Sequence, residues 1–212
     1  MQGIVIKRLG HNVTILEQSL SSAREGQAAG IVTMEHSQNF LTRHDLLRDE
    51  PYAVNCPAVQ ILDGSLKVKH EFQRRMQMSS WNVLYHRLRA NFDGLKSPYS
   101  TREPQEAGGV GRAVYDQGKR TTEVQLVGDT VRVGFEDVVN HTTGTLFADL
   151  VLVADGSASQ MRVLLQPQLK HTYAGYVAWR GTVVESSVSE QTRDIFKNKT
   201  TLHAFDGGYI AL

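Results

Sequence analysis

The sequence lacks most of the features that mark a secreted or membrane-embedded protein. Its single cysteine, Cys56, excludes a disulfide framework and any zinc site made from several cysteines. No apolar run approaches the roughly 20 residues that a membrane-spanning helix needs. The opening apolar stretch is too short and too interrupted by charge for a signal peptide. We therefore expect a cytoplasmic protein without a membrane partner.

An excess of charge of either sign is also missing. The chain carries 23 lysines and arginines against 22 aspartates and glutamates, a formal net charge of +1. Nucleic-acid binding needs a concentrated basic face, so no nucleic-acid partner is expected. Hydrophobic residues make up 41% of the 212 residues, which is enough for one large domain or two small ones with a real core.

The patterns of a metalloenzyme or a hydrolase are absent as well. The 8 histidines include no pair at the i, i+3 or i, i+4 spacing of a helical metal site. Ser157 does not lie in a G-x-S-x-G elbow. Cys56 precedes Pro57 and has no basic neighbour in the sequence, which favours an inert thiol. We predict no metal site and no side chain with a catalytic role of its own.

What is present is a succession of short helices and strands. Residues 1–9 have an apolar helical pattern that Gly10 ends, and residues 12–16 form a β-branched strand; together they make the second half of a βαβ unit. Residues 150–154, LVLVA, are continuously apolar and predict a strand covered on both faces. The other predicted elements are a helix over 34–47, hairpin strands over 59–62 and 66–71, a helix capped by Ser79 or Ser80, a loop over 94–112, hairpin strands over 122–127 and 131–135, a short helix over 160–165 and a strand over 173–184.

Two acidic residues follow predicted strands, where open α/β sheets bind their ligands. Glu17 comes after residues 12–16 and is placed as a ribose-binding acid would be, although it also fits a solvated acid at a strand end. Asp155 follows residues 150–154, and Asp155-Gly156 also fits a simple turn that is fastened by an Asp155–Arg162 pair. These local patterns leave both interpretations open.

Several motifs, in order along the chain, resemble the class A FAD-dependent aromatic hydroxylases. The stretch ADLVLVADGSASQMR is similar to a signature of that family, with matches at Asp155, Gly156, Ser159 and Arg162. HNVTILEQ resembles the strand that ends in the ribose-binding acid, and AAGI resembles the small-residue segment near the flavin. SSWNVLYHRL and YAGYVAWRG point to the branch that includes 2,6-dihydroxypyridine 3-monooxygenase, which has many fungal members.

The resemblance implies a monooxygenase that hydroxylates a small aromatic or heteroaromatic substrate with O2, FAD and either NADH or NADPH. The cofactor carries that chemistry, and the protein orients and shields it. The residues that the resemblance assigns to cofactor binding are Glu17, Arg24, Ala29, Gly30, Asp155, Gly156 and Arg162. Two alternatives stay open: a non-catalytic remnant that binds no flavin, and an NAD(P)-dependent oxidoreductase.

Two family motifs are missing from the sequence, the G-x-G-x-x-G loop expected before Met1 and the Gly-Asp motif expected after Leu212. The resemblance therefore implies a fragment that is truncated at both ends, and both ends look like the interior of a domain. The expected fold class is α/β, a partial Rossmann-type FAD-binding layer interleaved with an incomplete mixed or antiparallel β substrate-binding layer. We assign residues 1–45 and 81–165 to the first layer, and residues 46–80 and 166–212 to the second.

Overall fold

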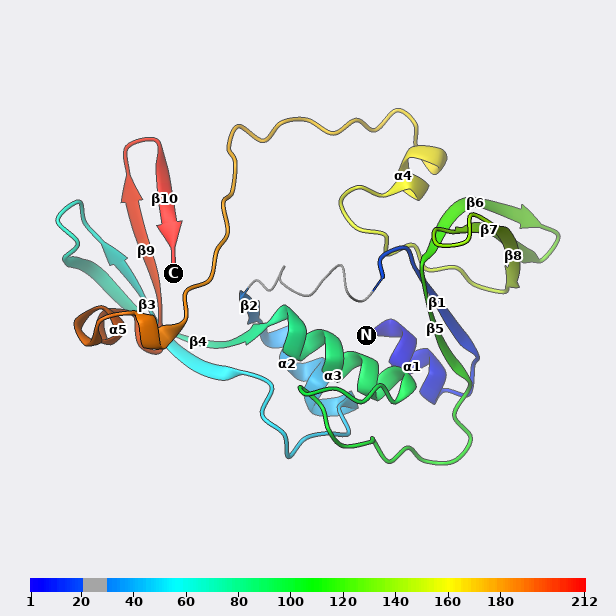
Figure 1. The fold of residues 1–212 in the computed structure, drawn as a ribbon, viewed down its shortest axis with the longest axis horizontal. Helices are drawn as coiled ribbons and strands as arrows, with labels where there is room; N and C mark the ends of the chain where they lie inside the picture. Colours follow the sequence, from blue (N-terminus) through cyan, green and yellow to red (C-terminus); the bar gives the residue numbers. More distant parts are fainter. Residues whose placement is uncertain (21–29) are drawn as a thin grey trace. The chain divides into compact units, whose positions relative to one another are not determined.

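The computed structural model describes residues 1–20 and 30–212, which gather into two compact units (Figure 1). Among the described residues, the first unit contains 1–11, 30–110 and 180–212, and the second contains 12–20 and 111–179. Each unit is described by itself below.

Three helices pack together in the first unit: α1 (Gln2–Arg8), α2 (Glu35–His44) and α3 (Trp81–Asp93). The two ends of α3 follow from local chemistry. The Ser80 hydroxyl accepts a hydrogen bond from the Val83 N–H at 3.3 Å, and Gly94 ends the helix in the left-handed conformation that glycine adopts without strain. The helices predicted over residues 1–9 and 34–47 and from Ser80 onward are therefore confirmed.

The same unit contains a five-stranded mixed sheet in the order β10-β9-β3-β4-β2. The hairpin predicted around Asp63 is confirmed, because the Asp63 carboxylate accepts hydrogen bonds from the backbone N–H groups of Ser65 and Lys67. Sequence analysis missed the parallel pairing of β3 with β9. The strands are β2 (Gly30–Thr33), β3 (Val54–Leu62), β4 (Val68–Ser80), β9 (Lys199–Phe205) and β10 (Gly208–Ala211), and a short helix, α5 (Glu190–Phe196), contacts β9.

The second unit combines a parallel strand pair with an antiparallel meander. β1 (Val13–Glu17) pairs in parallel with β5 (Ala113–Gln117), so that Glu17 lies beside Gln117 at the end of both strands. The meander has the order β6-β7-β8. Its strands are β6 (Lys119–Val127), β7 (Thr130–Asp137) and β8 (Thr143–Ala148), and a short helix, α4 (Gln160–Leu165), follows.

Two predicted strands are wrong. Residues 150–154 form no strand, and Leu150 and Leu152 are more than half exposed. An apolar run becomes a strand only when a neighbour supplies ladder hydrogen bonds, and no strand in the described part of the chain pairs with it. Residues 173–184 also form no strand: Gly175 adopts a φ of 91°, outside extended geometry, and a 3₁₀ turn (Glu185–Ser187) follows.

The predicted fold class is confirmed. Helices are interspersed among the strands along the chain, the β1–β5 pair is parallel as in a Rossmann-type layer, and the larger sheet is mixed. The assignment of residues 1–45 and 81–165 to a cofactor layer, and of 46–80 and 166–212 to a substrate layer, stays a prediction, because the two compact units group residues by proximity and not by the ligand they bind.

Candidate functional site

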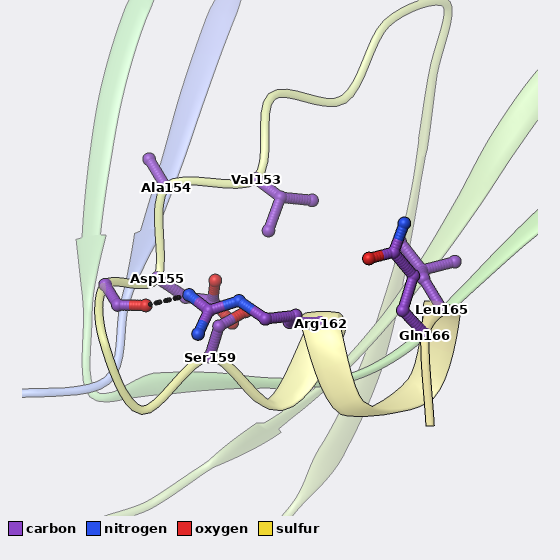
Figure 2. A pocket seen from close by; sticks show the side chains of 8 residues that line it. Val153, Ala154, Asp155, Ser159, Arg162, Leu165 and Gln166 are labelled. Atoms are coloured by element: carbon purple, nitrogen blue, oxygen red, sulfur yellow. Dashed lines mark hydrogen bonds between the residues drawn. The ribbon is translucent and has the colours of Figure 1, made fainter. Parts of the chain in front are cut away.

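The candidate site is the turn that leads into α4 in the second unit. Figure 2 shows the side chains of this turn around an open pocket of about 290 Å3. That volume is at the lower end of the range of ligand pockets, roughly 300–1,000 Å3, and suits one part of a larger ligand. The lining residues are Val153, Ala154, Asp155, Gly156, Ser159, Arg162, Leu165 and Gln166.

The turn is built by hydrogen bonds to the first N–H groups of α4. The Ser159 hydroxyl accepts from the Arg162 N–H at 2.9 Å, and the Asp155 carboxylate accepts from the Met161 N–H at 3.2 Å. These N–H groups have no partner inside the helix, so the two side chains together cap it. Gly156 adopts a φ of 80°, and a methyl group there would meet no heavy atom within 4 Å. The backbone at Gly156 is therefore open to close approach by a ligand.

Arg162 holds the other side of the turn. Its guanidinium donates to the Gly156 carbonyl at 2.8 Å, the dashed line in Figure 2, and to the Ser157 carbonyl at 3.1 Å. These two carbonyls, rather than the Asp155 carboxylate, bind the guanidinium. Arg162 therefore holds the turn through two backbone carbonyls, in place of the direct Asp155–Arg162 pair that the sequence left open. The Asp155 carboxylate caps the helix instead.

The electrostatics of the turn favour an ionised Asp155. Its slight burial alone would raise the pKa of the carboxyl, but hydrogen bonds from the Ser159 hydroxyl and from the Met161 and Gln160 N–H groups outweigh that effect, so the pKa lies below its ordinary value. At neutral pH Asp155 is a hydrogen-bond acceptor only.

Glu17 lies in the same unit, at the end of β1. Its Oε1 accepts a hydrogen bond from the Ser19 N–H at 2.8 Å, which fixes the carboxylate just beyond the strand. Glu17 is the last residue of the parallel strand β1, which runs one residue beyond its predicted end, and it therefore lies at the edge where open α/β sheets bind ligands.

The remaining predicted residues lie elsewhere. Gly30 begins β2 in the first unit, where it pairs with Ser80, and a methyl group on it would meet nothing within 4 Å. Arg24 and Ala29 lie outside the described residues. The structure therefore brings Asp155, Gly156 and Arg162 into one turn, with Glu17 in the same unit.

Sequence analysis missed the apolar half of the pocket. Leu165 lies one helical turn after Arg162, so its helical spacing from the signature was a usable signal. Val153 and Ala154 had been assigned to a buried strand, and that assignment concealed their role as pocket lining.

In the described part of the chain, no helix has the length and apolar character needed to cross a bilayer.

The fold is similar to that of part of known flavin-dependent aromatic hydroxylases. Residues 173–212 match a family model described as "FAD binding domain-like". A curated relative, 2,6-dihydroxypyridine 3-monooxygenase from Paenarthrobacter nicotinovorans, is 34% identical over 82 residues, which are 39% of this chain and 19% of the relative.

Two solved structures of hydroxylating enzymes have a similar fold. That of 2,6-dihydroxypyridine-3-hydroxylase from Arthrobacter nicotinovorans matches 99% of this chain and 47% of its own, with a TM-score of 0.71 and 22% identity. p-Nitrophenol 4-monooxygenase from Pseudomonas putida matches 77% of this chain and 40% of its own, with a TM-score of 0.55 and 18% identity. The chain thus spans about half the length of the hydroxylase that it matches over 99% of its residues.

The second unit holds two carboxylates of a type that can accept hydrogen bonds from the hydroxyl groups of a dinucleotide. Glu17 and Asp155 are carboxylates at the ends of chain segments that lead into turns, and carboxylates accept hydrogen bonds from ribose or ribityl hydroxyl groups. The open backbone at Gly156 adds a place where a ligand can approach the main chain closely.

Proposed function

We propose that the chain is part of an FAD-dependent monooxygenase that hydroxylates a small aromatic or heteroaromatic substrate with NADH or NADPH and O2. We place it in the branch of 2,6-dihydroxypyridine 3-monooxygenase, among its fungal members, as an internal portion of the full-length enzyme. The observation that carries the proposal is the turn of Asp155, Gly156, Ser159 and Arg162, found in a chain with this fold.

In this proposal each site residue binds or orients the cofactor. Glu17 accepts hydrogen bonds from the hydroxyl groups of the adenosine ribose. Asp155 accepts a hydrogen bond from the flavin part of the cofactor and also takes part in nicotinamide binding. Arg162 keeps the turn in shape through its two carbonyl contacts. Arg24, Ala29 and Gly30 contribute a further cofactor segment. When bound, FAD supplies the redox chemistry that puts one oxygen atom on the ring.

The charge state of Asp155 supports this assignment. A carboxylate with a lowered pKa stays ionised at neutral pH and offers acceptor atoms without a proton that would compete. Asp155 caps α4 together with Ser159, and its carboxylate has acceptor positions beyond the one that the Met161 N–H uses. Asp155 can therefore accept a hydrogen bond from a ligand as well as cap the helix.

A second candidate is a non-catalytic remnant that binds no flavin. The exposure of large apolar side chains favours it, because a chain with so much uncovered apolar surface is suited to association with another polypeptide. The most exposed of these side chains include Leu126, Tyr173, Val183 and Trp179, with Trp179 92% exposed.

Flavin binding by the purified chain separates the two. The chain is titrated with FAD and followed by flavin fluorescence, in parallel with an Asp155→Asn variant and with NAD+ as a competing dinucleotide. The proposal expects saturable FAD binding that the variant weakens. A colourless protein that also fails to take up added FAD would refute it and favour the remnant.

A further inference from the structure

Ser159 is part of the candidate site, but the proposed function gives it no role beyond capping α4. It is 4% exposed, while the other residues that line the pocket are exposed or half-buried. Its side chain lies next to those of Asp155 and Arg162 (Figure 2). A buried hydroxyl group is unfavourable unless it makes hydrogen bonds, so its partners indicate what it does in the turn.

The Ser159 hydroxyl has two partners and uses a different part of the group for each. Its oxygen accepts a hydrogen bond from the Arg162 N–H at 2.9 Å, and its proton is donated to the Asp155 carboxylate. A serine hydroxyl has one proton, so the bond to Asp155 uses the whole donor capacity of the side chain. The helix therefore fixes the oxygen, and the carboxylate fixes the direction of the O–H bond.

The other donors to Asp155 depend on Ser159 as well. They include the N–H groups of Gln160 and Met161, which follow Ser159 in the chain, and the Met161 N–H lies 3.2 Å from Asp155 Oδ2. These groups point at the carboxylate only while the first turn of α4 is formed, and Ser159 is the N-cap residue of that turn. Rotation of a carboxylate about its own bond is soft, so several donors are needed to hold an exposed one in a single plane.

Ser159 also joins the two sides of the turn. Its hydroxyl holds the backbone N–H of Arg162, and the guanidinium of the same arginine holds the backbone on the other side. That guanidinium donates to the Gly156 carbonyl at 2.8 Å and to the Ser157 carbonyl at 3.1 Å. Loss of the one buried hydroxyl therefore releases the Asp155 carboxylate and the start of α4 together.

We propose that Ser159 is a positioning residue for the candidate site: its hydroxyl holds the Asp155 carboxylate in the orientation that accepts a hydrogen bond from the cofactor. The inference rests on the proposed function, in which Asp155 binds the flavin part of FAD. Ser159 acts through Asp155, because its only proton is already donated to that carboxylate. A carboxylate that is oriented before the ligand arrives does not have to be ordered on binding, and this strengthens binding.

A double-mutant cycle on the 212-residue chain tests this link. Ser159→Ala and Ser159→Gly both remove the hydroxyl, but glycine costs little at a cap position, so Ser159→Gly keeps the start of the helix. Each change is made in the parent chain and in an Asp155→Ala background. Ser189→Ala is the matched control, because Ser189 caps α5 of the first unit in the same way, through the Thr192 N–H at 3.3 Å.

Two quantities are measured at a temperature at which each variant is folded. They are the affinity for FAD, from flavin fluorescence, and the pKa of Asp155, from the pH dependence of its carboxyl carbon signal in NMR. In the parent chain we expect both Ser159 changes to weaken FAD binding about tenfold, the effect of losing one hydrogen bond to a charged group. They should also raise the pKa of Asp155 toward its ordinary value, because the carboxylate loses a donor.

Three comparisons should show little change. Ser159→Thr keeps a hydroxyl and is expected to keep both quantities. In the Asp155→Ala background, removal of the Ser159 hydroxyl should alter FAD affinity less than about twofold, because no carboxylate is left to orient. Ser189→Ala should lower the melting temperature and change neither quantity.

An FAD affinity within about twofold of the parent, in both folded Ser159 variants, would overturn the inference. An equal loss in the Asp155→Ala background would overturn it too, because Ser159 would then act on the helix and not through the carboxylate. A parent chain that binds no FAD would refute the proposed function and the inference with it. The pKa of Asp155 in the variants would still show whether the hydroxyl holds the carboxylate.

Discussion

Among the described glycines, Gly144 is the one where an added methyl group would make the shortest contact with a neighbouring atom. It pairs with Phe135 across the β7–β8 ladder, and the phenylalanine ring lies over it. A methyl group on Gly144 would lie 2.8 Å and 3.0 Å from the two Cε atoms of Phe135, and closer still to Cζ. Ordinary carbon–carbon contacts are about 3.5–4.0 Å, so the ring has to move.

The expected cost follows from two opposing effects. Overpacking of a well-filled site costs about 1–3 kcal/mol, and replacing glycine within a strand by alanine returns about 0.5–1 kcal/mol. We therefore expect Gly144→Ala to lower the free energy of unfolding by about 1–2 kcal/mol. For a chain of this size that is a fall of about 2–8 °C in the melting temperature, measured by circular dichroism.

A double-mutant cycle with Phe135→Leu checks the cause. Without the ring, the added methyl group has room, so Gly144→Ala should cost clearly less in the Phe135→Leu background than in the parent chain. An equal cost in both backgrounds, or no cost in the parent, would refute the steric explanation.

Three further predictions concern the buried ion pair of Asp45 with Arg87 and the candidate site. Asp45→Ala leaves Arg87 buried without its carboxylate and should cost about 3–5 kcal/mol in chemical denaturation; a cost below 1 kcal/mol would contradict the buried pairing. Glu17→Ala should weaken FAD binding by about 1.5–3 kcal/mol in a titration, and unchanged affinity would return Glu17 to the role of a surface acid. Asp155→Ala should slow flavin reduction by NAD(P)H and remove a helix cap worth about 1 kcal/mol. Because the pKa of Asp155 is lowered on folding, this stabilisation is fully present above its ordinary value of 3.8 and is lost as the pH falls through the lower pKa of the folded state. A difference in melting temperature between the parent and Asp155→Ala that persists in strong acid would contradict that assignment.

Features set by neighbouring residues were predictable from the sequence. The hairpin at Asp63 depends on hydrogen bonds across four residues, and the start of α3 on a contact between Ser80 and Val83. The turn from Asp155 to Arg162 is equally local, since the contacts that shape it join residues no more than six positions apart. Interactions between residues so close in the chain depend on the local sequence, so a sequence motif can predict them.

Features that depend on distant partners were not predictable. Asp45 pairs with Arg87 across 42 positions of the chain, and the sequence around neither residue indicates which partner it has. The apolar run at 150–154 indicated a strand, but strand formation needs a hydrogen-bonding neighbour, which local composition cannot specify. The parallel pairing of β3 with β9 was missed for the same reason.

That pairing has a consequence for the order in which the chain can fold as it is synthesised. Gln60 bonds to Thr201 across 141 positions, and the described residues of the second unit all lie between α1 and β9 in the sequence. At about 5–20 residues per second, the ribosome needs about 7–28 seconds to make the residues that separate the two strands. The hairpin of β3 and β4 can form early, since its contacts are local, but β3 has an unpaired edge until β9 emerges. During that interval the edge is open to pairing with other chains. Slower synthesis of the second unit should therefore increase aggregation of the nascent chain.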